Sequence, residues 1–413
     1  MTDHPRPGDA ERGSGDPSTS APDTSAVRPG RRRADRHTPT GHTDSSGSES
    51  RPARSIPALS GRRRTEPRRG FIRRHLSLTS LASVLVLMGC SAGGYLWWLN
   101  EQLDNIPRAE MGIEENAEKN GNEGGKPLNI LLIGADHGQE GQSVAEDLED
   151  GEWTPYQHLS DTLMIAHIPA DRKSVQLVSI PRDTWVEIDG YPAANNRGKL
   201  NAAFSYGGPA MSLQAVEDLT DVTIDHVAII DWVGFRDLTS ALGGVRVYIP
   251  ETFEDTSQNV IWEQGWQTLE GERALQYVRT RYGLENGDFD RIKRQQNFMR
   301  STMSTLLSGS TTRNPVKVTK VVGVVTRYLT VDDTWDNDEI RDLALSLRDV
   351  STKDVDFITA PLGKYDRSAD GQSIVRLAPK KSGDLFQAIE DDDIPRYLDL
   401  YPDQGLGSPT TVN

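Results

Sequence analysis

The stretch Asn129-Ile130-Leu131-Leu132-Ile133-Gly134 is a short apolar run closed by glycine, and Ala135 and Asp136 follow it directly. Apolar runs of this length, bounded by glycine or polar residues, are typical of buried β-strands. Two similar runs, Thr162–Ile168 and Val175–Ile180, come after a polar gap at 138–159 and a turn-like segment at 169–172. The sequence therefore predicts three successive strands with polar residues near their ends.

Helical patterns alternate with further strand-like runs along the rest of the chain. Helices are predicted at 199–207, 210–219, 232–242, 288–307, 316–328 and 337–347, and strands at 227–230, 245–249 and 355–358. Strands that alternate with helices of about ten residues are typical of an α/β sandwich with a central sheet. We expect one folded domain at 127–392, followed by a flexible tail at 393–413.

The first 74 residues have a different composition. They are rich in Pro, Ser, Thr, Gly, Asp and Arg and contain few large apolar residues. Such a segment cannot bury enough apolar surface to offset its chain entropy, so we predict a disordered tail. The tail is basic, although the whole chain has a formal net charge of −15. It shows no helix-turn-helix pattern, and we expect no nucleic-acid partner.

An uncharged run from Leu76 to Trp98 follows this tail. It is long enough to cross a bilayer as a helix, and arginines precede it at 62–64, 68–69 and 73–74. Because basic flanks stay on the cytoplasmic side, residues 75–98 are predicted to be a transmembrane helix with a cytoplasmic N-terminus. The chain after residue 98 is then extracytoplasmic, beginning with an acidic, Gly-rich linker at 99–126.

Two processing alternatives remain open for this segment. It could be a cleaved signal sequence, or Cys90 could carry a lipid, because the preceding residues 87–89 loosely resemble a lipobox. The apolar run continues past Cys90 and starts far from residue 1, which favours an uncleaved anchor. Cys90 is the single cysteine of the chain, so the exported part has no disulfide.

The common catalytic motifs are missing from the sequence. It contains no GxGxxG before a helix, no GxxxxGK[ST], no HExxH and no GxSxG. The candidate chemical groups are instead carboxylates and guanidinium groups. Carboxylates that hold Mg²⁺, together with several arginines, suit a phosphate or pyrophosphate site, because phosphoryl transfer requires charge neutralisation. The carboxylates near the predicted strand ends and in the later basic stretch are Asp136, Asp161, Asp183 and Asp288.

That basic stretch runs from Tyr277 to Gln296. It places Arg279 and Arg281 two residues apart in what we interpret as extended chain, and then Arg291 and Gln295 four apart near the start of a helix. Both spacings put the paired side chains on one face, so an anion could lie between them. An ordinary solvated helix start is the alternative, and we retain it for Lys293 and Arg294.

Five blocks of the sequence carry a family resemblance: NILLIGAD (129–136), SDTLMIAHI (160–168), VSIPRDT (178–184), KLNAAFSYGG (199–208) and YVRTRYGLENGDFDRIKRQQ (277–296). Together these blocks resemble the LytR-CpsA-Psr family of cell-wall enzymes over about residues 127–307, in order, and we expect the resemblance to include the trailing helices to about residue 392. The resemblance implies an extracytoplasmic phosphotransferase that moves a glycopolymer from a polyprenyl-pyrophosphate carrier to peptidoglycan through a phosphodiester. It also implies a three-layer α/β/α fold with a central mixed sheet, an apolar pocket for the lipid, and a membrane location.

The resemblance also implies roles for individual residues. Asp136 and Asp161 correspond to carboxylates that hold Mg²⁺, or Mn²⁺, at the pyrophosphate. The pyrophosphate contacts correspond to Arg182, Arg279, Arg281 and Arg291, with Gln295 on the pyrophosphate or lipid side. Asp183, Lys199, Asn201, Asp288 and Arg294 belong to the same blocks with less defined roles. The segment between Asp136 and Asp161 is longer than is usual in the family, and in this chain it contains several acidic residues.

The implied reaction is attack by a sugar hydroxyl, the C6 hydroxyl of muramic acid, on the phosphorus nearer the glycan. Asp161 and Asp183 are the candidates for the general base. Two other functions use the same site: a membrane-tethered regulator that only binds polyprenyl pyrophosphates, and a pyrophosphatase in which water replaces the sugar. The sequence does not identify the glycopolymer, since any such polymer presents the same pyrophosphate.

Overall fold

The computed structural model describes residues 90, 93–95, 97–113, 125–136, 144–149, 151, 153–280 and 288–410. All of them belong to one compact unit, Phe71–Asn413. The predicted tail at 1–74 and most of the predicted span at 75–98 lie outside the described residues. Among the helices that are described, none has the length and apolar character needed to cross a bilayer.

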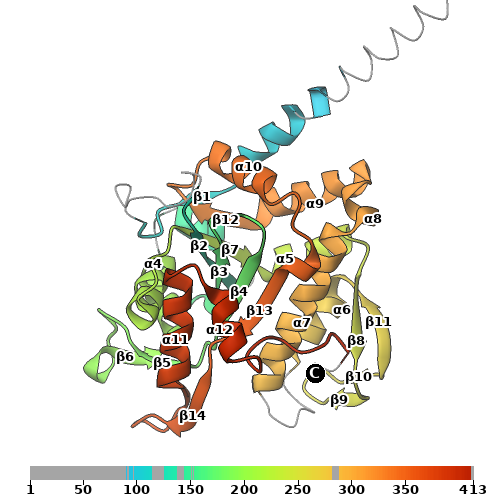
Figure 1. The fold of residues 1–413 in the computed structure, drawn as a ribbon. Helices are drawn as coiled ribbons and strands as arrows, with labels where there is room; N and C mark the ends of the chain where they lie inside the picture. The colour runs from blue at the N-terminus through green and yellow to red at the C-terminus, as the bar shows by residue number, and fades with distance from the viewer. Residues whose placement is uncertain are drawn as a thin grey trace, which may run out of the picture. The chain divides into compact units, whose positions relative to one another are not determined.

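A seven-stranded sheet lies at the centre of this unit (Figure 1). Strand β2 pairs in parallel with β7 and antiparallel with β3, and β4 pairs antiparallel with β3 and in parallel with β13. The sheet is therefore mixed, as predicted. Its strands, in spatial order, are β1 (Arg108–Ala109), β12 (Leu329–Asp332), β7 (His226–Asp231), β2 (Leu128–Asp136), β3 (Leu159–Ile168), β4 (Val175–Ile180) and β13 (Val355–Thr359).

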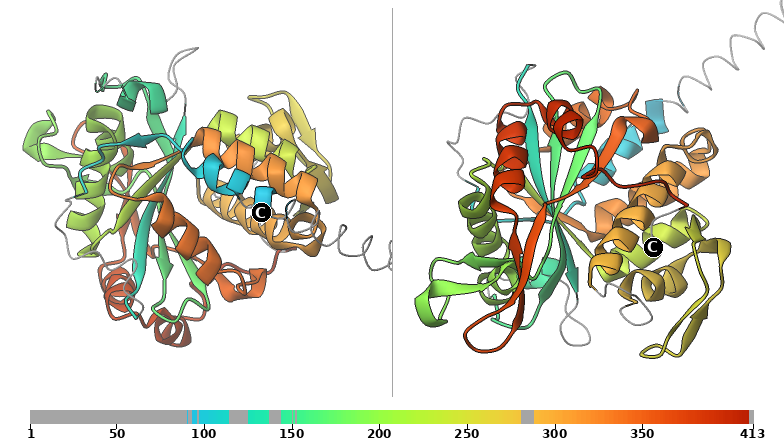
Figure 2. Two further views of the ribbon diagram at one scale, coloured as in Figure 1. Left: turned by 90° about the horizontal axis from the view of Figure 1, so that it is seen from above. Right: turned by 60° about the horizontal axis from the view of Figure 1, so that its bottom comes forward.

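Both faces of the sheet are covered by helices, because side chains alternate between the faces along each strand. Leu131 and Ile133 face the core formed with α4 (Leu200–Thr220), α11 (Pro379–Glu390) and α12 (Ile394–Leu400). Ile130 and Leu132 face the opposite core, against α7 (Asp288–Leu307) and α10 (Asn337–Ser346). Figure 2 shows the green and red helices on one side of the sheet and the orange helices on the other. The three-layer α/β/α prediction is confirmed.

A third core lies beside α7, outside the central sheet. It includes α5 (Trp232–Ala241), α6 (Gly271–Arg279) and α9 (Pro315–Tyr328), with the short α8 (Gly309–Thr312) between α7 and α9. Two ribbons pack here, β8 (Val245–Ile249) with β11 (Gly265–Leu269) and β9 (Phe253–Asp255) with β10 (Val260–Trp262). The remaining elements are α3 (Val144–Glu149), β5 (Trp185–Glu187), η1 (Ala194–Asn196), β6 (Arg197–Lys199), η2 (Thr352–Asp354), β14 (Leu362–Arg367) and β15 (Ser373–Leu377).

Three predicted boundaries can be compared with the structure, and two of them differ from it. The predicted break between the helices at 199–207 and 210–219 is present, because α4 is interrupted where Gly208 adopts a φ of 72° before Pro209. The expected linker at 99–126 contributes β1 to the sheet and the fully buried Met111 to the core. The expected tail after 392 contains α12, and the Leu406 amide donates to the Phe357 carbonyl at 2.8 Å. These segments are too short or too polar to show a periodicity, and tertiary contacts fix them.

Candidate active site

Three strand ends meet at one edge of the sheet because β3 runs antiparallel to both of its neighbours. Asp136 ends β2, Asp161 lies near the start of β3, and Arg182 follows the end of β4 by two residues. The register between β2 and β3 shifts between Gly134 and Ala135, so that Asp161 is an extra residue on β3. Such a bulge redirects side chains, and both Asp161 and its neighbour Thr162 line the same cavity.

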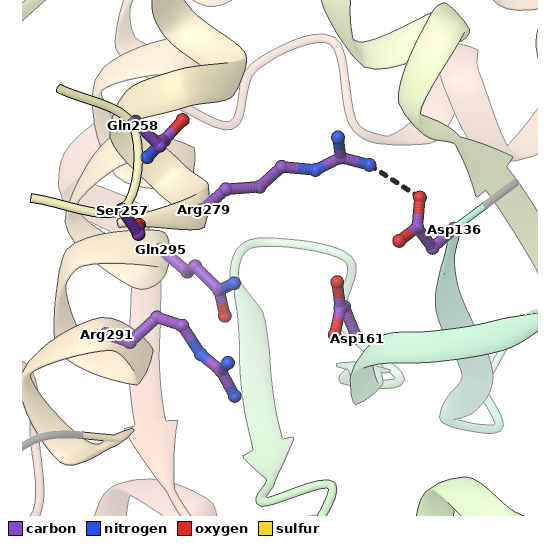
Figure 3. Close-up of a pocket in the computed structure, with 7 residues that line it drawn as sticks. All are labelled: Asp136, Asp161, Ser257, Gln258, Arg279, Arg291 and Gln295. Carbon is purple, nitrogen blue, oxygen red and sulfur yellow. Dashed lines mark hydrogen bonds and ion pairs between the residues drawn. The ribbon is translucent and has the colours of Figure 1, made fainter. Parts of the chain in front are cut away.

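Two ion pairs connect these carboxylates to arginines. Arg182 Nη1 donates to Asp161 Oδ1, and both side chains are largely buried. Arg279 Nη2 donates to Asp136 Oδ1 at 2.5 Å in a more open position, with 37% and 33% of the two side chains exposed. Figure 3 shows the two aspartates on one wall, facing Arg279, Arg291 and Gln295 on the other. Of the residues predicted from the sequence, Asp136, Asp161, Arg279, Arg291 and Gln295 therefore meet across one space.

Arg279 is the last residue of helix α6, which corrects the prediction that it lies in extended chain. The helix forms because Ala274, Leu275, Tyr277 and Val278 share its buried face. The Arg279 guanidinium also lies over the Trp232 ring, 4.7 Å from its centroid. Stacking on an aromatic face fixes the plane of the guanidinium while leaving its edge free to bind.

Helix α7 supplies the second basic edge, as the spacing predicted. Arg291 is 2% exposed, and Gln295 Nε2 donates to the Val278 carbonyl at 3.4 Å. Arg294 was expected to face solvent, but it is fully buried, with its guanidinium 4.6 Å from the Phe253 ring centroid. Lys293 is exposed as expected. Arg281 lies outside the described residues, and so does the side chain of Asp288.

The space between the walls is a polar cavity of about 400 Å³. It is lined by Asp136, Asp161, Ser257, Gln258, Arg279, Arg291 and Gln295 (Figure 3). An apolar cavity of about 340 Å³ lies between the sheet and helices α5 and α7. Its walls include Leu132, Ala228, Phe235, Met299, Met303 and Leu306. Asp161, Arg291 and Gln295 line both cavities, so the polar and the apolar cavity adjoin at these three residues.

The other predicted site residues support the loop that carries Arg182. Lys199 Nζ lies 2.9 Å from Asp183 Oδ1, and the Asn201 amide donates to the Arg182 carbonyl at 3.0 Å. The Asp183 carbonyl accepts from the Val375 amide at 3.0 Å. Within the described chain, Asp183, Lys199 and Asn201 line neither cavity. The structure therefore places them in the support of the Arg182 loop and outside the lining of either cavity.

The polar cavity also suits a divalent cation in part. Among the described residues, no group of three or more His, Cys, Asp or Glu side chains could hold a metal ion. Mg²⁺, however, is commonly bound through one or two carboxylates together with the phosphates of a substrate. Asp136 and Asp161 are the two carboxylates that line this cavity.

A family model described as the LytR_cpsA_psr family matches residues 100–389, which is most of the chain. The chain belongs to the LytR-CpsA-Psr family. The strand ends, the arginines of α6 and α7, and both cavities all lie inside the matched range. The resemblance stated from the sequence blocks is thus confirmed over a longer segment than those blocks cover.

Three known LytR-CpsA-Psr proteins illustrate the similarity. "Cell wall biosynthesis protein LcpA" of Corynebacterium glutamicum is 31% identical over 75% of this chain and 64% of its own length. "Polyisoprenyl-teichoic acid--peptidoglycan teichoic acid transferase TagU" of Enterococcus faecalis is 29% identical over 64% of this chain and 80% of its own. The structure of a LytR-Csp2A-Psr enzyme from Actinomyces oris matches with a TM-score of 0.53 at 20% identity, covering 69% of this chain and 95% of that one, which shows a shared fold.

Sequence reasoning missed three residues of this LytR-CpsA-Psr site. Ser257 and Gln258 reach the polar cavity from the tip of the β9–β10 ribbon, and Trp232 lies beneath Arg279. The strands β9 and β10 have three residues each, too few for a visible alternation. The polar turn at 255–259 was the one available signal, and such turns are common on any protein surface.

Proposed function

We propose that this LytR-CpsA-Psr protein is a phosphotransferase that moves a glycopolymer from a polyprenyl-pyrophosphate carrier to peptidoglycan. The observation that carries the proposal is the junction of the two cavities at Asp161, Arg291 and Gln295. A polyprenyl pyrophosphate has one apolar part and one strongly anionic part. The apolar cavity suits the prenyl chain, and the arginines at its mouth suit the pyrophosphate, because guanidinium groups bind phosphate through paired hydrogen bonds.

The names of the relatives support the same reaction class. TagU of E. faecalis is named as a polyisoprenyl-teichoic acid–peptidoglycan transferase, and LcpA of C. glutamicum as a cell wall biosynthesis protein. The present chain matches less than two thirds of the length of LcpA. The polymer that this chain transfers is therefore left open in the proposal.

In the proposed reaction a peptidoglycan hydroxyl oxygen forms a bond to the phosphorus nearer the glycan. The bond from that phosphorus to the bridging oxygen breaks, and polyprenyl phosphate leaves. Arg182, Arg279 and Arg291 stabilise the charge on the transferring group. Of the two candidate bases, Asp161 lines both cavities whereas Asp183 lines neither. We therefore propose that the Asp161 carboxylate accepts the proton of the attacking hydroxyl. Arg182 holds that carboxylate in place.

We further propose that Asp136 and Asp161 hold Mg²⁺ or Mn²⁺ when the substrate is bound. A bound divalent cation would neutralise the phosphate oxygens and polarise the phosphorus. Arg279 and Arg182 already lie against these carboxylates, so they keep the two aspartates oriented toward the cavity before substrate arrives.

Membrane attachment through residues 75–98 completes the proposal. The predicted span ends within the helical residues 97–103, and Trp97 is 67% exposed, as suits a tryptophan at a bilayer interface. An extracytoplasmic domain anchored in this way has access to both lipid-linked polymer and peptidoglycan.

One product assay tests the proposal against its alternatives. The full-length protein is reconstituted in lipid nanodiscs with a polyprenyl-pyrophosphate-linked glycan, with and without peptidoglycan. Transfer predicts polyprenyl phosphate release together with glycan attached to peptidoglycan. Release of free glycan phosphate regardless of acceptor would show a pyrophosphatase, and binding without turnover would show a regulator. Either of these two results would contradict the proposal.

A further inference from the structure

The tip of the β9–β10 ribbon is organised around a buried carboxylate. Asp255 is fully buried, and its oxygens accept from the Ser257 amide at 2.9 Å, the Ser257 hydroxyl at 2.5 Å and Gln258 Nε2 at 2.7 Å. The donor groups of both side chains therefore point inward, away from the polar cavity that Ser257 and Gln258 line.

These contacts determine which way the Gln258 amide points. Nε2 also donates to the Gln276 carbonyl at 3.0 Å and lies 3.4 Å from Thr280 Oγ1, whose own proton goes to the Gln276 carbonyl. Every partner on that side is an acceptor, so the nitrogen belongs there and the amide oxygen is directed the other way. The Ser257 hydroxyl likewise donates its proton to Asp255, and its oxygen lone pairs can accept hydrogen bonds.

The tip of the β9–β10 ribbon thus presents hydrogen-bond acceptors to the cavity, whereas the neighbouring arginines present donors. Phosphate oxygens are acceptors, so they form no hydrogen bonds with the acceptors of the ribbon tip. A sugar hydroxyl can donate a hydrogen bond, but guanidinium groups have no acceptor atom to receive it. Within the described residues, Ser257 and Gln258 line the polar cavity and are not part of the apolar one.

We propose that Ser257 and Gln258 form the subsite for the acceptor sugar, accepting hydrogen bonds from its hydroxyl groups beside Arg279. The inference rests on the transferase function proposed above and adds the place where the acceptor binds. It gives the two substrates neighbouring groups: the pyrophosphate contacts Arg279 and Arg291, and the attacking sugar contacts the ribbon tip beside Arg279. Figure 3 shows Ser257 and Gln258 beside Arg279 on the cavity wall.

Asp255 is the positioning residue of this subsite. Burial opposes its ionisation, but hydrogen bonds from Ser257 and Gln258 outweigh burial and hold the pKa of Asp255 below its ordinary value. The carboxylate therefore stays ionised at neutral pH and accepts from both neighbours continuously. Thr280 directly follows Arg279, so the same network ties the ribbon tip to the end of helix α6.

The test replaces the acceptor oxygen of Gln258 in the full-length protein. Gln258→Met removes the oxygen at nearly constant size, and Gln258→Lys also removes it but keeps a donor for Asp255. The matched control is Gln264→Met, since Gln264 is an exposed glutamine just after β10 whose Nε2 donates to the Pro250 carbonyl. Transfer is followed as a function of peptidoglycan concentration, and donor affinity is measured with polyprenyl pyrophosphate.

We expect both Gln258 variants to raise the KM for peptidoglycan about tenfold, the effect of one lost hydrogen bond, with unchanged affinity for polyprenyl pyrophosphate. The Gln264 control should match wild type. An unchanged KM in the folded Lys variant, or an equal loss of donor affinity, would overturn the acceptor subsite while leaving the transferase intact. Absence of transfer by the wild-type protein would instead overturn the proposed function, and the subsite with it.

Discussion

The Arg279 guanidinium donates to the Asp136 carboxylate at 2.5 Å and so joins the end of helix α6 to the end of strand β2, 143 residues apart in sequence. Neither residue is deeply buried, so the pair contributes little to stability. The pair holds the Arg279 guanidinium and the Asp136 carboxylate in the lining of the polar cavity, where both are available to a substrate.

Replacing Arg279 is expected to remove activity without unfolding the protein. Arg279→Ala should lower the transfer rate by about 100-fold or more, the usual effect of losing a group that stabilises transition-state charge. Arg279→Lys should restore only part of the rate, because lysine cannot form the paired hydrogen bonds. The control is Arg273→Ala in the same helix, which stacks on Trp262 and lines neither cavity within the described chain. Equal losses for Arg273 and Arg279 would contradict the assignment.

Filling the apolar cavity is expected to act on long donors only. Ala228 lies on the sheet face of that cavity, and Ala228→Leu places extra methyl groups inside it. We expect about a tenfold loss of affinity for long-chain polyprenyl pyrophosphates, since apolar contacts of a few methylene groups are lost. A short-chain donor with the same pyrophosphate serves as the internal control and should bind as before. A parallel loss for both donors would show that the cavity does not hold the prenyl chain.

Removing divalent cations tests the role proposed for Asp136 and Asp161. Chelation with EDTA should abolish transfer, and Mg²⁺ or Mn²⁺ should restore it. Asp136→Asn should raise the Mg²⁺ concentration needed for half-maximal activity, because a neutral amide binds the cation more weakly. Full activity in EDTA, or the same Mg²⁺ dependence in the variant, would refute the metal assignment.

The stability of the fold is expected to depend on Asp332 at low pH. Burial opposes its ionisation, but hydrogen bonds from His226, Thr334 and the Val227 amide outweigh burial and place the pKa of Asp332 below its ordinary value. A carboxyl group with a lowered folded-state pKa stabilises the protein above its ordinary pKa, and this contribution is lost as the pH falls through the folded value. We expect the melting temperature to fall as the pH is lowered below about 4.

The variant Asp332→Asn separates this group from the other carboxylates. It should lower the free energy of unfolding at neutral pH by about 3 kcal/mol, the cost of breaking a buried charged contact, and should flatten the acid dependence. Asp333→Asn is the matched control, because the neighbouring Asp333 is exposed. An acid transition that is identical in wild type and Asp332→Asn would assign the pH dependence to other groups.

The sequence by itself determined the central strands, most of the covering helices and the chemical class of the site. Short, mostly apolar runs such as 129–133 and 175–180 indicated buried strands, and apolar residues three and four apart along α7 indicated its buried face. Asp136, Asp161 and Arg182 could be grouped in advance because successive strands placed them at chain reversals. These are local patterns, and local patterns are readable from one chain.

Only the tertiary structure decided how these groups face one another. The bulge at Asp161 depends on the register between β2 and β3, and Arg279 reaches Asp136 because α6 packs between α5 and α7. Asp183 and Lys199 come from the same sequence blocks as the site residues, yet they pair with each other outside the lining of the polar cavity. Ser257 and Gln258 reach the cavity from the β9–β10 ribbon, which has no recognisable sequence pattern. Register and packing depend on contacts between distant segments, and no short stretch of sequence contains both partners of such a contact.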